Sequence, residues 1–347
     1  MTSVFEAEDF DNHEVVHFVN DKKTGLKAII ALHSTHLGPA GGGIRMQPYE
    51  NSQAALKDVL RLSKGMSYKN ALAGIELGGG KSVIIGNPKT DKSPELFHAF
   101  GQAIADLGGK YIAAEDVGTT LKDMEYISQK TKYVFGRDPK DGFGGDPSPM
   151  TAYGVFLSLK ESVKHKLGAT DLKGIKVAVQ GAGAVGKNLI KQLVEAGAKV
   201  CFTDVDVDRI AAVQNEFGAE FVALDDIISA DVDVFAPCAL GAVLNDTSIP
   251  QLKAKVVCGA ANNQLAKDVH GVKLVEHDIL YAPDYVANAA GIINVFYEID
   301  GQYDVKKVMA HIEKIPHTLS EIFKIADETG QPTALVADEM ARNKIGR

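Results

Sequence analysis

Two lysines and one aspartate stand where proton transfer could occur. Lys69 and Lys81 are embedded among apolar or small residues, and Lys81 follows the three glycines of Gly78–Gly80. Desolvation makes a lysine a usable base near neutral pH. The glycines leave room for a ligand, and Asp116, at the end of a predicted strand, would supply a counter-charge. In the alternative interpretation, each lysine only extends its charged end into solvent.

A glycine-rich segment predicts a dinucleotide site. Gly181, Gly183 and Gly186 follow a predicted strand and open a helix, and Asp204 ends the next strand 18 residues after Gly186. The first glycine permits a tight turn, the second lets the pyrophosphate approach the backbone, and the third lets the helix pack closely on the strand. The N-terminus of the helix favours the negative charge of the phosphates. A carboxylate at Asp204 accepts hydrogen bonds from the ribose hydroxyls and repels a 2′-phosphate, which predicts that the cofactor is NAD and not NADP. The alternative is a glycine-rich turn without a ligand. The predicted cofactor contacts are Gly181, Ala182, Gly183, Ala184, Val185, Gly186 and Asp204.

Two further patterns resemble motifs but lack their context. His13 and His17 have the spacing of an H-E-x-x-H zinc site, which requires a helix, whereas this segment is rich in strand formers. On a strand the two imidazoles would stand about 13 Å apart, too far to share a zinc ion. Gly78–Ser82 resembles the end of a phosphate-binding loop, but Ile75 occupies the position of its first glycine and the segment precedes a strand. We expect neither a metal site nor a nucleoside triphosphate site.

The composition is that of an ordinary globular protein. The 347 residues are 45% hydrophobic and 24% charged, with 37 Lys and Arg against 45 Asp and Glu, a net charge of −8. At about 150 residues per domain, this length predicts two domains. There is no dense basic run, so nucleic acid is not an expected partner. No apolar stretch reaches the ~20 residues of a membrane span and the N-terminus is acidic, so we expect a cytoplasmic protein with no membrane partner. The three cysteines suit reduced core thiols.

The first part of the chain predicts an α/β domain over residues 1–135. Capping residues precede apolar stripes that have the period of a helix, and short apolar runs between the helices are typical of buried strands. The predicted elements are a hairpin over residues 14–32, helices beginning near Asn51 and Ser93, and strands at 82–85 and 111–114.

The second part predicts a Rossmann-type domain over residues 151–324. Turn-forming residues at 136–150 mark a linker before it. Strands and helices then alternate, which predicts a parallel sheet with helices on both faces. A C-terminal helix at about 325–347 is expected to return and complete the first domain. The predicted elements are helices at 151–167, 184–196 and 207–217 and strands at 176–180, 199–203, 232–236 and 255–259.

Together these segments resemble the leucine, phenylalanine and valine dehydrogenases, distant relatives of glutamate dehydrogenase. The resemblance implies an N-terminal α/β substrate and oligomerisation domain, a Rossmann-type NAD domain and an active-site cleft between them. It also implies a homo-oligomer that reversibly deaminates an apolar L-amino acid with NAD, giving the 2-oxo acid, ammonia and NADH. Nine blocks in family order carry it: residues 38–46, 65–70, 78–81, 114–120, 147–154, 181–186, 236–241, 259–264 and 281–285.

The resemblance assigns roles to individual residues. Lys81 matches the catalytic lysine that activates water, and Asp116 matches the acid that exchanges protons with the amino nitrogen. Lys69 matches the residue that binds the substrate carboxylate. Thr151 and Asn262 match contacts to the nicotinamide end of the cofactor. The implied substrate pocket comprises Lys69, Gly41, Gly42, Gly43, Met66, Ile292 and Val295.

Substrate preference stays open at this stage. Leucine dehydrogenases usually carry Leu where this chain has Gly41, and phenylalanine dehydrogenases carry Gly, whereas Ile292 matches neither pattern. One side chain in an apolar pocket changes discrimination by only ~1 to 3 kcal/mol, so Leu, Val, Ile, Phe and Trp are all candidates. Dimer, tetramer and octamer also stay open, as does the physiological direction. Two alternative functions are a catalytically silent NAD-binding module and a 2-hydroxy acid dehydrogenase. The second ordinarily needs a His general base, and no His stands in a block comparable to those around Lys69 and Lys81.

Overall fold

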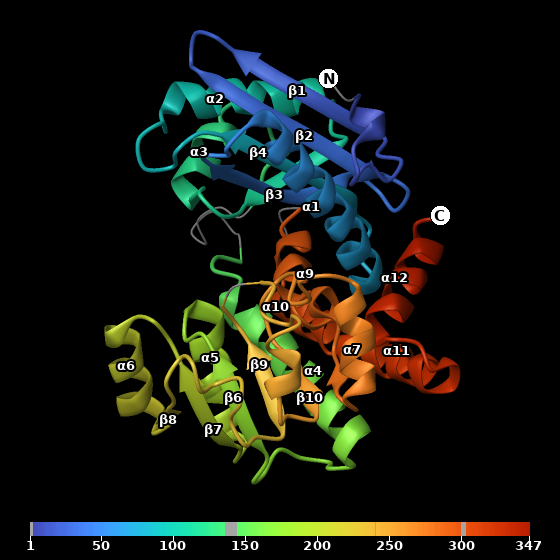
Figure 1. Cartoon of the computed structure of the whole chain (residues 1–347). Helices are drawn as coiled ribbons and strands as arrows, with labels where there is room; N and C mark the ends of the chain where they lie inside the picture. The colour runs from blue at the N-terminus through green and yellow to red at the C-terminus, as the bar shows by residue number, and fades with distance from the viewer. Residues whose placement is uncertain (1–2, 136–143, 240, 300–302) are drawn as a thin grey trace. The chain divides into compact units, whose positions relative to one another are not determined.

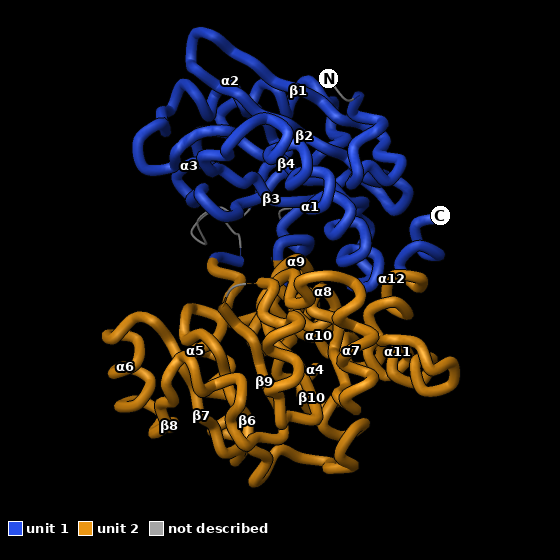
Figure 2. Tube along the Cα trace, in the orientation of Figure 1, with its two compact units in different colours: residues 1–145, 295–304, 341–347 blue, residues 146–294, 305–340 orange. Residues whose placement is uncertain are grey.

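The computed structural model describes residues 3–135, 144–239, 241–299 and 303–347, which form two compact units. Unit 1 comprises Met1–Gly145, Val295–Asp304 and Ala341–Arg347, and unit 2 comprises Asp146–Asn294 and Val305–Met340 (Figure 2). Residues 136–143 of the predicted linker lie outside the described residues.

Unit 1 is built on a five-stranded mixed sheet in the order β1-β2-β4-β3-β5. The predicted hairpin is present, with β1 antiparallel to β2, and β2 is antiparallel to β4. β3 is parallel to both β4 and β5, so it lies between them. The strands are β1 Val15–Asp21, β2 Leu26–Ser34, β3 Ala40–Gln47, β4 Gly78–Ile85 and β5 Tyr111–Glu115.

Helices cover both faces of this sheet (Figure 1). α1 (Ser52–Ala73) packs on one face, and α2 (Pro94–Asp106) and α3 (Leu121–Ser128) pack on the other. Asn51 accepts a hydrogen bond from the backbone of Ala54 and so caps α1, as its position before the apolar stripe predicts. A short 3-10 helix (Val4–Glu6) precedes the sheet.

The three glycines before Lys81 form the start of β4, which corrects the expectation that they leave room for a ligand. A Cβ atom on Gly79 would lie 2.1 Å from the backbone nitrogen of Ser67 in α1, and one on Gly80 would lie 2.9 Å from the ring of Tyr111. The glycines therefore let α1 and Tyr111 pack directly against the strand. Protein atoms occupy the space that the missing side chains leave.

Unit 2 contains a six-stranded parallel sheet in the order β11-β10-β9-β6-β7-β8. This order is that of the Rossmann-type fold, in which ligands bind at the carboxyl ends of the strands where the order reverses. That point lies between β6 and β9. The strands are β6 Lys176–Gln180, β7 Lys199–Thr203, β8 Glu220–Phe221, β9 Val234–Pro237, β10 Val256–Val257 and β11 Leu280–Tyr281. The predicted α/β class is confirmed.

The remaining helices connect these strands and follow them. A 3-10 helix (Ile249–Gln251) lies before β10. The α-helices are α4 Ser148–Leu167, α5 Ala184–Glu195, α6 Val207–Phe217, α7 Val269–Glu276, α8 Asp284–Ala287, α9 Ala290–Phe296, α10 Val305–Ile312, α11 Ile315–Thr329 and α12 Thr333–Lys344.

The end of the chain differs from the predicted return of residues 325–347 to the first domain. α11 belongs to unit 2 because it buries Leu319, Ile322 and Phe323 there, and Phe323 stacks on His165 of α4 at a ring distance of 5.0 Å. Of residues 325–347, only Ala341–Arg347 belong to unit 1.

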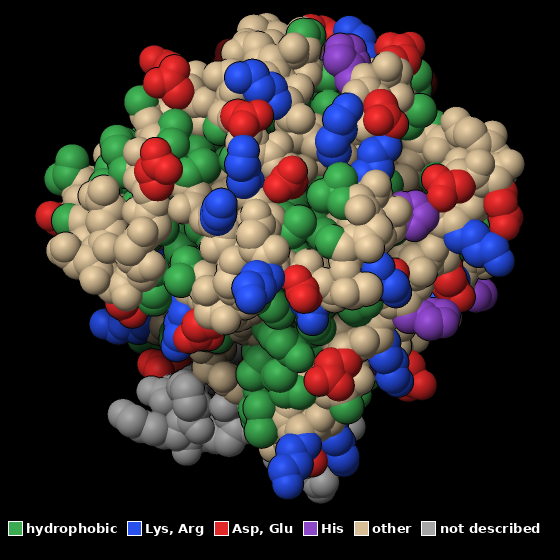
Figure 3. Space-filling view, turned by 90° about the horizontal axis from the view of Figure 1, so that it is seen from below, with side chains coloured by type: hydrophobic (Ala, Val, Ile, Leu, Met, Phe, Trp, Pro, Cys, Tyr) green, Lys and Arg blue, Asp and Glu red, His purple; other side chains and the backbone are tan. Residues whose placement is uncertain are grey.

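The surface seen in Figure 3 carries charges of both signs. Lys and Arg side chains are interleaved there with Asp and Glu, and neither sign dominates among the described residues on that face. Within the described parts of the chain, no helix is both long enough and apolar enough to span a bilayer.

Candidate active site

Lys81 and Asp116 form an ion pair in unit 1. The Nζ atom of Lys81 lies 2.7 Å from Oδ2 of Asp116, and Lys81 is only 6% exposed. Lys81 belongs to β4, and Asp116 directly follows β5, so the pair spans β3, which lies between those strands. A Cβ on Gly43 of β3 would lie 2.7 Å from Cβ of Asp116 and 3.1 Å from Nζ of Lys81. The pair can therefore form because position 43 has no side chain.

A second cation contacts the same carboxylate. Nε of Arg45 donates a hydrogen bond of 3.2 Å to Oδ2 of Asp116. Burial alone would raise the pKa of Asp116, but the charges of Lys81 and Arg45 outweigh it and lower the pKa to about 2. Asp116 is therefore a carboxylate at any physiological pH.

The sequence alone did not indicate a role for Arg45 or for the residues that hold it. Its guanidinium donates to both carboxylate oxygens of Asp58 in α1, at 3.4 and 3.1 Å, and Tyr49 donates to Oδ2 of Asp58 at 2.6 Å. The available signal was the spacing of Gly43 and Arg45, which share one face of a strand because they are two residues apart. That signal can be used only if residues 40–47 are known to form a strand, and the strand propensity of this glycine-rich segment does not predict one.

Three further predicted substrate residues, Gly42, Met66 and Lys69, belong to β3 and α1 of unit 1. A Cβ on Gly42 would lie 1.7 Å from the carbonyl oxygen of Gly80 and 3.3 Å from Cγ of Met66, so Gly42 and Met66 are neighbours. Lys69 is half-buried on α1, three residues after Met66 and therefore about one turn further along the helix.

The other predicted pocket residues have different surroundings. A Cβ on Gly41 would lie 3.0 Å from Cδ1 of Leu77 and 3.6 Å from Nδ2 of Asn70. Ile292 is half-buried in the part of α9 that belongs to unit 2, and Val295 belongs to unit 1.

The glycine-rich turn of unit 2 has the geometry of a dinucleotide site. Gly181 has a φ of +99°, which suits glycine. Gly183 precedes α5, and apart from its chain neighbours only the guanidinium of Arg209, 3.9 Å away, comes near its missing Cβ among the described residues. A Cβ on Gly186 would lie 1.9 Å from the carbonyl oxygen of Gly181. These are the roles of tight turn, open approach and close packing expected of the three glycines. Ala184 and Val185 form the first turn of α5.

Asp204 lies against this turn. Its carboxylate accepts hydrogen bonds from the backbone of Ala182 at 2.6 Å and of Asp206 at 2.9 Å, and its side chain is 5% exposed. Arg209, which is mostly exposed, approaches Oδ1 of Asp204 to 3.9 Å. The acid is thus fixed beside the turn, with a cation next to it.

The two residues predicted for the nicotinamide end also lie in unit 2. Asn262 is exposed, and its Oδ1 accepts a hydrogen bond of 2.9 Å from Nδ2 of Asn288. This bond leaves the amide nitrogen of Asn262 as a donor for a ligand. A Cβ on Gly291 would lie 2.7 Å from the hydroxyl oxygen of Thr151.

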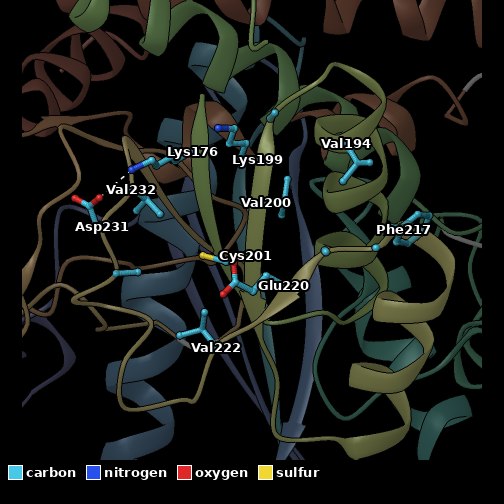
Figure 4. Close-up of a pocket in the computed structure, with 14 residues that line it drawn as sticks. Lys176, Val194, Lys199, Val200, Cys201, Phe217, Glu220, Val222, Asp231 and Val232 are labelled. Atoms are coloured by element: carbon cyan, nitrogen blue, oxygen red, sulfur yellow. Dashed lines mark hydrogen bonds and ion pairs between the residues drawn. The ribbon is translucent and has the colours of Figure 1, made fainter. Parts of the chain in front are cut away.

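A hollow of about 600 Å³ lies at the amino ends of β6 and β7, whereas the glycine-rich turn follows the carboxyl end of β6 (Figure 4). Lys176 and Lys199, which begin these strands, line it together with Cys201, and Lys176 pairs with Asp231 at 2.8 Å. It contains none of the predicted site residues. Burial, with the charge of Glu220, raises the pKa of the Cys201 thiol, so this thiol is not activated.

The histidine pattern is not on a helix, and only its second histidine lies on a strand. His17 is in β1, and His13 precedes it, with Nε2 placed 3.0 Å from the carbonyl oxygen of Leu60 and 3.1 Å from the hydroxyl of Ser63. His13 is therefore a hydrogen-bonded core residue. The described residues hold no group of three or more His, Cys, Asp or Glu suited to a metal ion.

A glycine-rich turn on a Rossmann-type sheet, together with a buried lysine and carboxylate on a second sheet, defines a dinucleotide-dependent α/β enzyme. The sequence matches the Glu/Leu/Phe/Val dehydrogenase dimerisation domain over residues 13–133. It matches the second domain of Glutamate/Leucine/Phenylalanine/Valine dehydrogenase over residues 144–208 and 203–345. The chain belongs to the Glu/Leu/Phe/Val dehydrogenase family, and it is an amino acid dehydrogenase that uses a nicotinamide cofactor.

Relatives match along almost the whole length. Leucine dehydrogenase of Bacillus subtilis (strain 168) is 49% identical over 340 residues, covering 98% of this chain and 93% of the relative. Valine dehydrogenase of Streptomyces virginiae is 46% identical over 340 residues, covering 97% and 95%. The crystal structure of L-tryptophan dehydrogenase from Nostoc punctiforme superposes with a TM-score of 0.85 at 46% identity, covering 96% of each chain.

Proposed function

We propose that this protein catalyses the reversible NAD-dependent oxidative deamination of an apolar L-amino acid to its 2-oxo acid, ammonia and NADH. The observation that carries the proposal is the contact of 2.7 Å between Lys81 and Asp116 in a member of this family. A cation and a carboxylate at one point supply both proton transfers that deamination requires.

In this proposal the residues of unit 1 act on the amino acid. Lys69 binds its carboxylate. Lys81 releases its own proton to solvent and then, as a neutral amine, takes a proton from the water that attacks the substrate imine. Asp116, a carboxylate, first accepts a proton from the substrate ammonium and later returns it to the same nitrogen, which then leaves as ammonia. Gly43 borders Lys81 and Asp116, and Gly42 lies against Met66. We also assign Gly41, Ile292 and Val295 to the substrate pocket. For these three residues the assignment rests on the family resemblance alone.

Unit 2 would hold the cofactor. The open side of Gly183 and the start of α5 suit a pyrophosphate, and the buried carboxylate of Asp204 suits ribose hydroxyls and disfavours a 2′-phosphate. Thr151 and Asn262 would orient the nicotinamide end. When bound, NAD supplies the acceptor for the hydride that leaves the substrate Cα.

The substrate class follows from the relatives' names, which are those of leucine, valine and L-tryptophan dehydrogenases. The absence of a side chain at Gly41 favours a large substrate, and replacement by Leu should raise the preference for leucine over phenylalanine by roughly 10- to 100-fold. Replacement by Ala, which adds one carbon near Leu77, is the matched smaller change.

We also propose that the protein is a homo-oligomer that assembles through unit 1, because the family describes residues 13–133 as a dimerisation domain. Light scattering on the eluting protein distinguishes a dimer, tetramer or octamer, and a monomer at micromolar concentration would contradict this part of the proposal.

The test is NADH formation from NAD with L-Leu, L-Val, L-Ile, L-Phe, L-Trp and L-Glu, with NADP assayed in parallel. We expect turnover of at least one apolar amino acid and a preference for NAD. Lys81→Ala should still bind NAD but lose turnover by at least 100-fold. NAD binding without turnover of any amino acid would support a silent binding module instead.

A further inference from the structure

Two cations of different chemistry contact one oxygen of Asp116. Nζ of Lys81 lies 2.7 Å and Nε of Arg45 lies 3.2 Å from the same atom, Oδ2. A lysine can exchange its proton in a protein, whereas a guanidinium stays protonated at every working pH. The carboxylate therefore has one neighbour whose charge can change and one whose charge is constant.

Arg45 is itself held in a fixed orientation. Its other end contacts both oxygens of Asp58, and Tyr49 hydrogen-bonds to the same carboxylate. The Arg45 side chain is 21% exposed, so solvent screens it only in part. A planar guanidinium can bridge Asp58 and Asp116 at the same time, which a lysine at this position could not do equally well.

The proposed deamination requires Lys81 to lose its proton before it can accept one from water. At that moment Lys81 no longer offers a positive charge to Asp116. If Arg45 were absent, Asp116 would then be a partly buried carboxylate without a neighbouring cation, which is unstable and tends to take up a proton. The proton released by Lys81 would then be retained within the pair.

We propose that Arg45 is a positioning residue, which keeps Asp116 charged and in place while Lys81 is neutral. The proposal rests on the proposed roles of Lys81 and Asp116. Arg45 acts through Asp116, so it is not assigned a contact with substrate.

The groups that face this carboxylate fix the expected direction of a pH effect. The cations are Lys81 of β4 and Arg45 of β3, and Tyr49 and Tyr111 lie close enough for the charge of Asp116 to raise their pKa values. Asp58 of α1 faces Arg45 from the other side. Loss of the Arg45 charge removes repulsion from the Lys81 ammonium and attraction from Asp116. Both groups should then hold a proton more strongly.

The experiment compares pH profiles of kcat/KM for oxidative deamination in the wild type, Arg45→Gln and Arg45→Lys. In Arg45→Gln we expect the rising limb of the profile to move to higher pH by roughly one unit. Arg45→Lys restores a positive charge and should return the limb towards the wild-type position. The matched control is Arg61→Gln, because Arg61 also lies near an aspartate, Asp9, but on the exposed side of α1. Its profile should not move.

A second measurement keeps this test independent of activity. The yield of competitive acetic anhydride labelling at Lys81, followed by mass spectrometry across pH, reports when this amine loses its proton. The labelling curve of Arg45→Gln should move in the same direction as its rate profile. If the wild type has no turnover, the proposed function fails, and the labelling curve still decides the role of Arg45.

Two outcomes would overturn the inference. The first is an Arg45→Gln protein with wild-type circular dichroism and unchanged rate and labelling curves. The second is an equal movement in Arg61→Gln, which would indicate a general effect of net charge. If Arg45→Gln does not fold, Arg45→Lys decides by itself. A wild-type labelling curve in this variant supports the proposal that a positive charge at position 45 holds Asp116, and a curve shifted by a full unit contradicts it.

Discussion

The guanidinium of Arg347 donates a hydrogen bond of 2.9 Å to Nε2 of His33, which lies 314 positions earlier in the sequence. The same guanidinium donates to the backbone carbonyls of Asp11, Asn12 and His33 at 2.6 to 2.9 Å. Nδ1 of His33 in turn lies 2.8 Å from the hydroxyl of Ser67 in α1. The end of the chain is thereby fastened to the sheet and the helix of unit 1.

Replacing Arg347 should weaken unit 1. Arg347→Gln removes a charged donor from four acceptors, and we expect a loss of about 1 to 3 kcal/mol in the free energy of unfolding. Urea denaturation followed by circular dichroism measures it. Lys344→Gln, an exposed change near the end of α12, is the control and should stay within about 0.5 kcal/mol of the wild type. Equal midpoints for both variants would mean that the Arg347 contacts carry no net stability.

His33 should make the protein less stable as the pH falls. Burial, with the charges of Arg347 and His13, lowers the pKa of His33 to about 3, whereas the unfolded value is about 6.5. Between these values the unfolded state binds a proton that the folded state does not, so stability decreases as pH falls through this range. Between pH 7 and pH 5 this residue should account for about 2 kcal/mol.

His33→Gln should therefore lose less stability than the wild type between pH 7 and pH 5, as measured by urea midpoints at both values. The control is His317→Gln, because His317 is 78% exposed. It should retain the full wild-type decrease. A decrease in His33→Gln as large as that of the wild type would show that other groups cause the acid sensitivity.

The parts of the fold that sequence predicts well are local. The helix of α6 and the strands β6 and β7 have their predicted bounds because each has a clear hydrophobic period and a turn at each end. The roles of Gly181 and Gly186 follow from a short segment whose geometry is fixed by the turn that it makes.

The parts that sequence does not predict depend on neighbours in space. β3 begins with Ala40 and three glycines, which have weak strand propensity, and it forms because β4 and β5 pair with it on both sides. The contact of Arg45 with Asp116 follows only from that strand order. The contact of Arg347 with His33 joins residues 314 positions apart, and no local pattern indicates it.

Asp204 should determine the preference for NAD over NADP. Asp204→Asn keeps an acceptor for Ala182 but removes the charge that repels a 2′-phosphate, and Arg209 lies beside it to attract one. We expect the ratio of kcat/KM for NAD to that for NADP to fall by about 10- to 100-fold. In Asp204→Asn/Arg209→Gln the gain with NADP should largely disappear. An unchanged ratio in the single variant would exclude Asp204 as the residue that selects the cofactor.

Gly43 offers a direct test of the site, because a side chain there would meet both residues of the ion pair and the backbone carbonyl of Glu115. In Gly43→Ala the new methyl group would lie 2.7 Å from Cβ of Asp116 and 3.1 Å from Nζ of Lys81, so these two groups must move apart. A displacement of about 1 Å in a catalytic group can cost roughly 100-fold in rate, and we expect kcat to fall by that order. NAD affinity, measured by calorimetry, should be unchanged, because the glycine-rich turn belongs to unit 2.

The matched control is Gly65→Ala on the exposed side of α1. A Cβ there meets no atom within 4 Å, and alanine is the better helix former by about 1 kcal/mol, so this variant should be as active as the wild type and slightly more stable. If Gly43→Ala kept wild-type turnover while Gly65→Ala behaved as expected, close contact between Lys81 and Asp116 across β3 would not be required for the reaction. A loss confined to Gly43→Ala would instead tie turnover to the 2.7 Å geometry of the pair.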